Sequence, residues 1–403
     1  MNHRKDADLL NRIEEDEIIS ELEDDEPEPV EMSESEIEEK YSETQGKLHI
    51  QRNDFLLLNI IDMVNDKATL NIAPGYQRRP RWNNKQNSHL IESILLNIPI
   101  PPIFLYEHEF AQYEVVDGQQ RLNAVKTFFD DLFLLEDMKK WRELNGRKFS
   151  DLPPKIQSGL RRRSLSAVII LTESSFKDQT DVMELRQYVF ERLNSGGEQL
   201  NAQEIRNCIY DSPFNKMLIR IARSRLFTDI WGIPPKEKGE PQLVSPELAK
   251  NQLYSKMKDC EIVLRYFALS NMEEFTRGMK LTLDNCMISM KTTSEEKCKI
   301  LEREYMDVLE IARDIYRENV FRLPGKSGRR SVPLADAILL AIRDVFDHAE
   351  KLKKNREYII AETEKILSDK ESYQTIVKRG NSKSVIEDRL AIINNLFHQA
   401  VKK

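Results

Sequence analysis

The sequence predicts an α+β protein in which a small mixed α/β domain precedes an all-helical C-terminal domain. Between residues 47 and 200, short runs rich in β-branched residues alternate with amphipathic stretches, which is typical of strands and helices in one small unit. From residue 201 to residue 403, apolar residues recur at helical spacing almost throughout and show no fixed repeat period. A chain of 403 residues that is 40% hydrophobic is long enough for two or three domains with a real core.

Residues 1–46 are expected to form an acidic arm outside both domains. Between Glu14 and Glu43 the chain carries 16 acidic side chains against Lys40 alone, a charge of −15. Because the whole chain has a net charge of −7, the remainder carries +8. So acidic a segment cannot bury enough apolar surface to fold alone, and we expect it to be disordered or transiently helical and dispensable for folding. It is either a solubilising arm or a segment that binds a partner or mimics DNA.

The composition also argues against several classes of protein. The N-terminus lacks an apolar signal region, and no run approaches the ~18 apolar residues of a membrane span, so we expect a cytoplasmic protein with no membrane partner. The cysteines lack a paired short spacing, which favours reduced thiols over disulfides or a zinc site. They are Cys208, Cys260, Cys286 and Cys298.

The elements of the α/β domain follow from local patterns. A concentration of β-branched and aromatic residues predicts strands at residues 70–73, 103–106, 113–117 and 165–171. Amphipathic helices are predicted at 84–97, where a proline-rich segment ends the helix, and at 182–193. Residues 55–64 are apolar without a clear period, so a helix and a buried strand both remain open there.

The rest of the chain is organised around the polar run between the strand at 113–117 and the helix after it. This run is Asp117-Gly118-Gln119-Gln120-Arg121. The free N–H groups and the positive dipole of a helix start attract phosphate or carboxylate oxygens. Gly118 allows a tight turn, and the neighbouring side chains supply an anion, two amides and a permanent cation within about one helical turn.

Two further polar stretches lie at element junctions. Tyr76, Gln77 and Arg78 follow Pro74-Gly75, and they belong either to a solvated loop or to the lining of an anion pocket. The helix predicted at 182–193 includes Arg192 and ends in Asn194, Ser195, Gly196 and Gly197. The two glycines suit a left-handed helix end and also let backbone N–H groups approach a ligand closely.

Several familiar kinds of catalytic site are missing from the sequence. The six histidines are isolated, and neither a Gly-x-Ser-x-Gly elbow nor a dinucleotide-binding fingerprint occurs. Residues 324–327 suggest a phosphate-binding loop, but Val320 stands where that motif needs its first glycine. By elimination, the polar junctions have the best claim to chemistry.

Taken in order, these stretches resemble the N-terminal family of GmrSD-type modification-dependent restriction endonucleases, whose domain has a ParB/sulfiredoxin-like fold. The resemblance covers about residues 50–225. Its motifs are Tyr76-Gln77-Arg78 with Trp82, Ser93-Ile94-Leu95-Leu96 with Ile98-Pro99-Ile100-Pro101-Pro102, Asp117-Gly118-Gln119-Gln120-Arg121-Leu122, and Phe190-Glu191-Arg192-Leu193-Asn194-Ser195-Gly196-Gly197 with Leu200-Asn201 and Glu204-Ile205.

The resemblance implies binding and hydrolysis of a nucleoside triphosphate with Mg²⁺, used to gate action on modified double-stranded DNA. The expected catalytic residues are Gln77, Asp117, Gln120 and Arg121, with Asp117 also holding the metal. The expected nucleotide-binding residues are Tyr76, Arg78, Gly118, Gln119, Arg192, Asn194, Ser195, Gly196 and Gly197. Because residues 201–403 contain no His-Asn-His constellation, DNA cleavage would need a companion nuclease, and a methyltransferase is another expected partner.

Two other hypotheses remain. The chain is alternatively a non-catalytic DNA-binding or adaptor protein on the same fold, whose basic clusters contact phosphates. These clusters are Arg78-Arg79-Arg81, Arg161-Arg162-Arg163, Arg220-Arg223-Arg225 and Lys326-Arg329-Arg330. In a purely structural interpretation, Asp117 caps the following helix and Arg121 pairs with Glu92 or Glu114.

Overall fold

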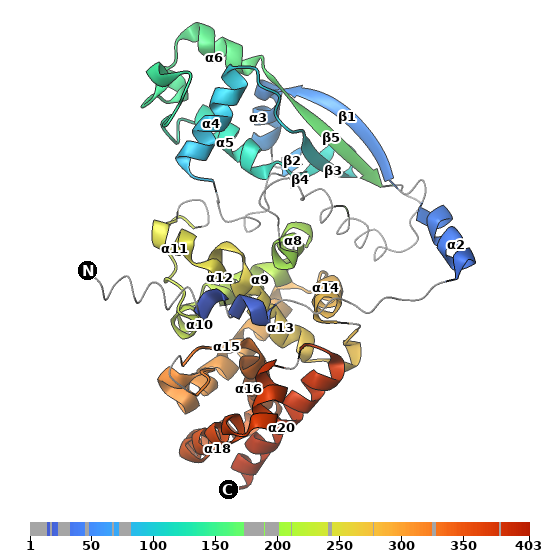
Figure 1. Cartoon of the computed structure of the whole chain (residues 1–403), viewed down its shortest axis with the longest axis vertical. Coiled ribbons are helices and arrows are strands. Elements are labelled where there is room, and N and C mark those ends of the chain that lie inside the picture. The colour runs from blue at the N-terminus through green and yellow to red at the C-terminus, as the bar shows by residue number, and fades with distance from the viewer. Residues whose placement is uncertain are drawn as a thin grey trace. The chain divides into compact units, whose positions relative to one another are not determined.

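A computed structural model of the chain forms two compact units, which we describe separately (Figure 1). One comprises residues 30–200, and the other comprises residues 201–403 together with a segment at residues 14–22. The structure describes residues 14–16, 18–22, 33–44, 48–66, 68–71, 82–172, 189, 201–210, 212–240, 244–276, 278–324, 328–378 and 380–403.

The first unit contains a five-stranded mixed sheet with the strand order β1-β5-β3-β4-β2. The pairs β1/β5 and β3/β4 are antiparallel, whereas β3/β5 and β2/β4 are parallel. The strands are β1 (Leu48–Leu56), β2 (Leu70–Asn71), β3 (Ile103–Glu109), β4 (Gln112–Asp117) and β5 (Ser164–Thr172). The helices are α2 (Glu34–Thr44), α3 (Leu57–Asn65), α4 (Asn84–Leu95), α5 (Gln119–Phe129) and α6 (Pro154–Arg161).

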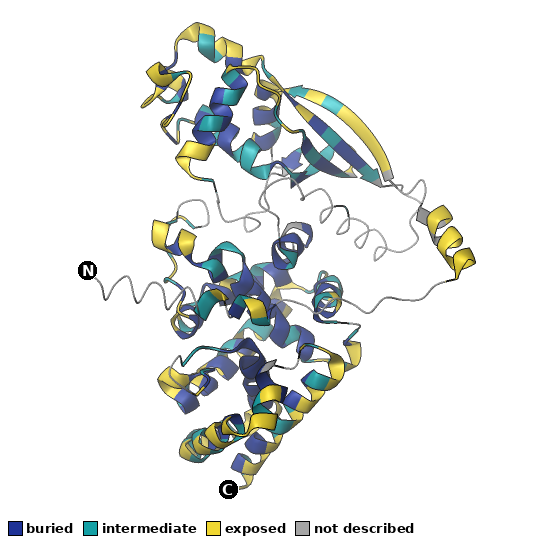
Figure 2. Cartoon of the chain, viewed as in Figure 1, coloured by how far each residue is buried: buried dark blue, intermediate teal, exposed yellow. Residues whose placement is uncertain are grey.

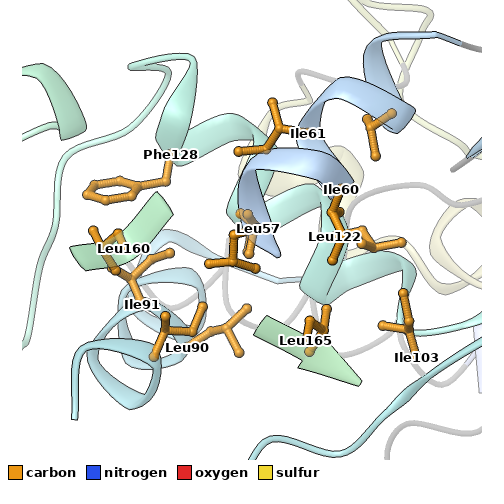
Figure 3. Packing of buried hydrophobic residues seen from close by; sticks show 14 of the residues in the cluster. Leu57, Ile60, Ile61, Leu90, Ile91, Ile103, Leu122, Phe128, Leu160 and Leu165 are labelled. Atoms are coloured by element: carbon orange, nitrogen blue, oxygen red, sulfur yellow. The ribbon is translucent and has the colours of Figure 1, made fainter. Parts of the chain in front are cut away.

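Helices α3, α4 and α5 cover one face of this sheet and share a core with it (Figures 1 and 3). The apolar stripe of α5 includes Leu122 and Phe128, which pack with Leu57 of α3, Ile91 of α4 and Leu165 of β5. Burying these side chains supplies the main stabilising free energy of the unit, at about 25 cal/mol per Å² of apolar surface. The core also fixes where β4 ends and α5 begins.

The second unit is helical around the central helix α16 (Val332–Asp344), which is buried along most of its length (Figure 2). Helix α16 packs against α13, α15 and α20. The other helices are α8 (Ala202–Ile209), α9 (Pro213–Ala222), α10 (Arg225–Trp231), α11 (Pro246–Lys250), α12 (Gln252–Ser255), α13 (Lys258–Leu269), α14 (Met279–Ser289), α15 (Glu295–Tyr316), α17 (Ala349–Lys354), α18 (Arg356–Ser368), α19 (Lys370–Tyr373) and α20 (Lys383–Lys402). The predicted order, a small mixed α/β part followed by a helical part, is confirmed.

The N-terminal segment departs from the expectation of a disordered arm. Residues 14–16 and 18–21 are helical, and Ile18 and Leu22, four positions apart, are buried against the second unit. Glu15 accepts hydrogen bonds from Asn251 Nδ2 at 2.7 Å and from the backbone N–H of Gln252 at 2.9 Å. The expectation failed because it weighed charge density and overlooked one apolar helical face. Helix α2, by contrast, is exposed wherever its side chains are described.

Two smaller expectations concern the membrane and the cysteines. Among the helices that the structure describes, none is both long and apolar enough to cross a membrane. Cys260, Cys286 and Cys298 are buried free thiols. Burial raises the pKa of the Cys286 thiol to about 12, which keeps this sulfur protonated.

Candidate functional site

The polar run lies at a sharp turn between β4 and α5. β4 ends at Asp117, and Gly118 takes a left-handed conformation with φ 98° and ψ 7° before α5 begins at Gln119. A side chain at position 118 would also collide with Ile103 at the start of β3. Glycine is therefore required here both by backbone conformation and by close packing.

The start of α5 has no side-chain cap. Its first backbone hydrogen bond runs from the N–H of Leu122 to the carbonyl of Gly118 at 2.9 Å. The N–H groups of Gln119, Gln120 and Arg121 precede this bond and meet no acceptor in the described part of the chain. Together with the helix dipole, such N–H groups favour an anion at this position. The side chains of Gln119 and Gln120 are half-buried beside them.

Arg121 is held by two acceptors. Its Nη2 donates to Asp117 Oδ2 at 2.7 Å and to the carbonyl of Pro102 at 3.3 Å. Its Nε is buried and has no hydrogen-bond partner among the described residues. Nη1 is the guanidinium nitrogen that remains for a ligand oxygen. Arg121 therefore stabilises the junction, and only part of its guanidinium is left for another acceptor.

The structural interpretation was wrong about the partners at this junction. Arg121 pairs with Asp117 instead of Glu92 or Glu114, and Asp117 does not cap α5. Glu92 Oε1 accepts the backbone N–H groups of Lys140 and Trp141, at 2.6 and 3.1 Å. Its role is to anchor the chain that follows α5.

Sequence reasoning missed the contribution of the segment before β3. The carbonyl of Pro102 accepts from Arg121, and the next residue, Ile103, packs against Gly118 (Figure 3 shows Ile103 near Leu122). In the register of the sheet, Phe104 lies opposite Asp117. The proline-rich motif was visible in the sequence, but its contact with Arg121, 19 positions later, depends on strand pairing.

The structure brings together only part of the predicted site. Asp117, Gly118, Gln119, Gln120 and Arg121 are contiguous at the junction. The other predicted site residues lie outside the described residues: Tyr76, Gln77, Arg78, Arg192, Asn194, Ser195, Gly196 and Gly197.

The last motif of the resemblance has a structural role. The side chain of Asn201 accepts the backbone N–H groups of Gln203 and Glu204 at the start of α8, at 2.9 and 3.1 Å. Glu204 in turn accepts the backbone N–H of Asn201 at 3.0 Å, which completes a capping box. These two side chains therefore fix where α8 begins.

The junction offers few ligands for a metal ion. The described residues contain no group of three or more His, Cys, Asp or Glu side chains that could hold a metal ion. Asp117 offers one carboxylate, and one of its oxygens already accepts from Arg121. Mg²⁺ usually keeps several waters and takes one or two carboxylates plus substrate phosphates. A single carboxylate is therefore compatible with Mg²⁺ that binds together with a phosphate ligand.

One predicted basic cluster is largely neutralised. Arg223 is buried and pairs with Glu240 at 2.9 Å, and Arg220 pairs with Glu302 at 2.7 Å. In the first unit, Arg161 and Arg162 are exposed, whereas Arg163 donates to the Asn97 side chain at 2.8 Å. The cluster Arg220-Arg223-Arg225 therefore serves the fold more than a ligand.

The fold and the site define a class of protein. It is a small mixed α/β domain with a polar run at the glycine turn where a helix begins. Residues 57–210 match the family model described as the GmrSD restriction endonuclease N-terminal domain, so this part of the chain is similar to that domain. No match was found among curated proteins or among solved structures.

Proposed function

We propose that this chain is the NTP-binding and NTP-hydrolysing subunit of a prokaryotic restriction or anti-phage defence system. In this proposal, nucleotide turnover gates action on modified double-stranded DNA, and a companion nuclease or methyltransferase acts on that DNA. The similarity of residues 57–210 to that domain supports the assignment to a restriction system. Nucleotide chemistry is our inference from the junction between β4 and α5.

One observation carries this inference. Three backbone N–H groups at the start of α5 have no acceptor among the described residues, and they lie beside Arg121 and two amide side chains. Phosphoryl transfer needs positioning and charge stabilisation more than covalent chemistry, and an array of N–H donors with an arginine supplies both. The left-handed turn at Gly118 directly precedes these N–H groups, and no side chain caps them.

Each residue of the junction has a separate role in the proposal. The N–H groups of Gln119 and Gln120 bind phosphate oxygens, and Nη1 of Arg121 adds a charge-assisted contact. The side chain of Gln120 orients the attacking water. Asp117 would hold Mg²⁺, which neutralises phosphate charge when it is bound with the nucleotide.

The remaining predicted residues would complete the pocket. In the proposal, Arg78 neutralises a second phosphate oxygen, Gln77 assists in placing water, and Tyr76 contacts the nucleotide. Arg192 and residues 194–197 would close the pocket through side-chain and backbone donors.

The test begins with the unmodified protein. Phosphate release is measured with ATP, GTP, CTP or UTP plus Mg²⁺, with and without a DNA duplex that carries a modified base. Gln120→Ala should bind nucleotide nearly normally but release phosphate about 100-fold more slowly, because the water loses its orientation. Lys126→Ala, further along α5, is the matched control and should release phosphate at the normal rate. Absence of both binding and release with all four nucleotides would refute the proposal.

A further inference from the structure

The N-terminal segment meets the helical unit at a group of three arginines. In the segment that connects α15 to α16, Arg322 and Arg330 are partners in an isolated antiparallel β-bridge. Arg329 is the residue before Arg330. Arg329 Nη1 donates to Glu21 Oε1 at 2.6 Å, and Arg330 Nη1 donates to Glu14 Oε1 at 2.9 Å. We call Arg322, Arg329 and Arg330 the arginine face.

One carboxylate oxygen is shared by two arginines of this face. A single oxygen, Glu14 Oε1, accepts both the backbone N–H and the Nη1 of Arg330, each at 2.9 Å, and lies 3.7 Å from Arg322 Nη1. Nε of Arg330 is buried and has no hydrogen-bond partner in the described part of the chain. Arg322 donates from Nε to the carbonyl of Glu318 at 3.2 Å and from Nη1 to the carbonyl of Gly328, so backbone carbonyls hold its guanidinium.

A buried positive charge lies behind the arginine face. Arg389 of α20 is 1% exposed, and its Nε and Nη1 have no hydrogen-bond partner among the residues described. It interacts electrostatically with Glu21, Asp336 and Arg265. Together with the arginine face, Arg265 and Arg389 make five guanidinium groups. The carboxylates that interact with these five among the described residues named here are Glu14, Glu21 and Asp336, and the first two belong to the N-terminal segment. Removing the segment would leave a strong positive potential.

Burial at this contact disfavours the charged forms of Glu21 and Arg330. Burial raises the pKa of the Glu21 carboxyl above its usual value, although Arg329 opposes the shift. Burial likewise lowers the pKa of Arg330. Arg330 also lines a cavity of about 590 Å³. The other charged residues around it are Arg313, Arg317, Lys353 and Arg356, and the carboxylates Asp229, Asp314 and Glu318. Cationic side chains therefore outnumber carboxylates, five to three, around this cavity.

We propose that the arginine face binds the phosphate backbone of nucleic acid, and that Glu14 and Glu21 occupy this face in cis. Arginine forks match phosphate oxygens. Glu14 approaches both Arg330 and Arg322 with a single oxygen, whereas successive phosphates of a nucleic acid would bring a separate anion to each arginine. An acidic peptide would supply only carboxylates of the kind already present. The inference does not rest on the proposed nucleotide chemistry, because that site lies in the other unit.

The experiment measures binding of a short fluorescein-labelled DNA duplex to the full chain. Neutralising both carboxylates, Glu14→Gln with Glu21→Gln, should tighten binding about tenfold or more and steepen the loss of affinity with salt. Glu38→Gln with Glu39→Gln on the exposed helix α2 changes the net charge equally and should tighten binding far less. Adding Arg322→Gln and Arg330→Gln to the first double variant should abolish the gain.

Several outcomes would overturn the proposal. One is equal tightening in the two double variants, which would mean that only net charge matters. Another is a gain that survives the arginine substitutions, and a third is tighter binding of inorganic triphosphate without tighter binding of DNA. If the first double variant does not fold, hydrogen exchange on the unmodified protein decides. Saturating duplex must then speed exchange at residues 14–22, and unchanged exchange would refute the occupation of this face in cis.

Discussion

Arg121 and Asp117 form an ion pair across the glycine turn, with 2.7 Å between Nη2 and Oδ2. The same nitrogen reaches the carbonyl of Pro102, so one guanidinium connects β4, α5 and the segment before β3. The two side chains are only 12% and 24% exposed, which limits screening by water and salt. The residue with the best claim to bind phosphate is thus also a structural brace.

Arg121→Ala should lower the free energy of unfolding of the nucleotide-free protein by ~1–3 kcal/mol, because it removes hydrogen bonds to two partly buried acceptors. Asp117→Asn should cost less, since the amide oxygen can still accept from Arg121. Urea unfolding followed by tryptophan fluorescence measures both.

Lys126 provides the matched control on the same helix. It pairs with Asp130 at the same i,i+4 spacing and at 2.6 Å, and it also donates to Asn65 Oδ1 at 2.8 Å, but both contacts are more exposed. Lys126→Ala should therefore cost at most ~0.5 kcal/mol. Equal losses at Arg121 and Lys126 would contradict the brace. Weakened nucleotide binding in Arg121→Ala alone would not prove a phosphate contact, which is why Gln120 carries the functional test.

Gly118→Ala should destabilise the first unit by at least ~2 kcal/mol. The substitution imposes a side chain on a backbone with φ 98° and drives it into Ile103. Gly159 in α6 is the control, because a side chain there would meet no atom within 4 Å. Gly159→Ala should be neutral or stabilising by up to ~1 kcal/mol. A similar response at both glycines, measured by urea unfolding, would show that the turn carries no strain.

The location of the candidate site was predictable because its residues are neighbours in the chain. A buried strand pattern followed by a helical pattern leaves Asp117 to Arg121 at the junction whatever the tertiary fold. The contact of Arg121 with Pro102 was not predictable, because it depends on which strands pair. The contact between Glu14 and Arg330 spans 316 positions, and no local pattern indicates it.

The strand β1 was missed for a different reason. It lies at the edge of the sheet, and Ile50 within it is 65% exposed, so its sequence lacks the apolar alternation of a half-buried strand. The ambiguous stretch at residues 55–64 contains a boundary: Leu56 ends β1, and Leu57 begins α3. Two elements with different periods within ten residues gave a pattern that fitted neither.

Glu92 should give the first unit a pH-dependent contribution to stability. Burial acts to raise its pKa, but hydrogen bonds from the backbone N–H groups of Lys140, Trp141 and Lys139 outweigh this effect, so the pKa lies below the usual 4.5. A carboxyl whose pKa is lowered by folding stabilises the fold above the unfolded-state pKa, and this stability is lost as the pH falls through the folded-state pKa. Glu92→Gln should therefore cost ~1 kcal/mol at pH 7 and progressively less below pH 4.5.

Urea unfolding of the Glu92→Gln variant at several pH values tests this. Glu136 lies in the same connection after α5, but its side chain is exposed. Glu136→Gln should change stability by less than ~0.5 kcal/mol at every pH. A loss at Glu92 that stayed constant down to acid pH would mean that packing, and not the ionised carboxylate, is responsible.

The N-terminal segment should stabilise the helical unit, contrary to the expectation from its charge. Ile18 and Leu22 are 1% and 4% exposed, so Ile18→Ala or Leu22→Ala should lower the free energy of unfolding by ~2–4 kcal/mol. Ile37 of α2 is 54% exposed, and Ile37→Ala should cost less than ~0.5 kcal/mol. Deleting residues 1–32 should lower the melting temperature and speed hydrogen exchange in α16, because Val332 loses the hydrogen bond from its N–H to Glu21. An unchanged melting temperature and unchanged exchange after the deletion would mean that the segment only rests on the surface.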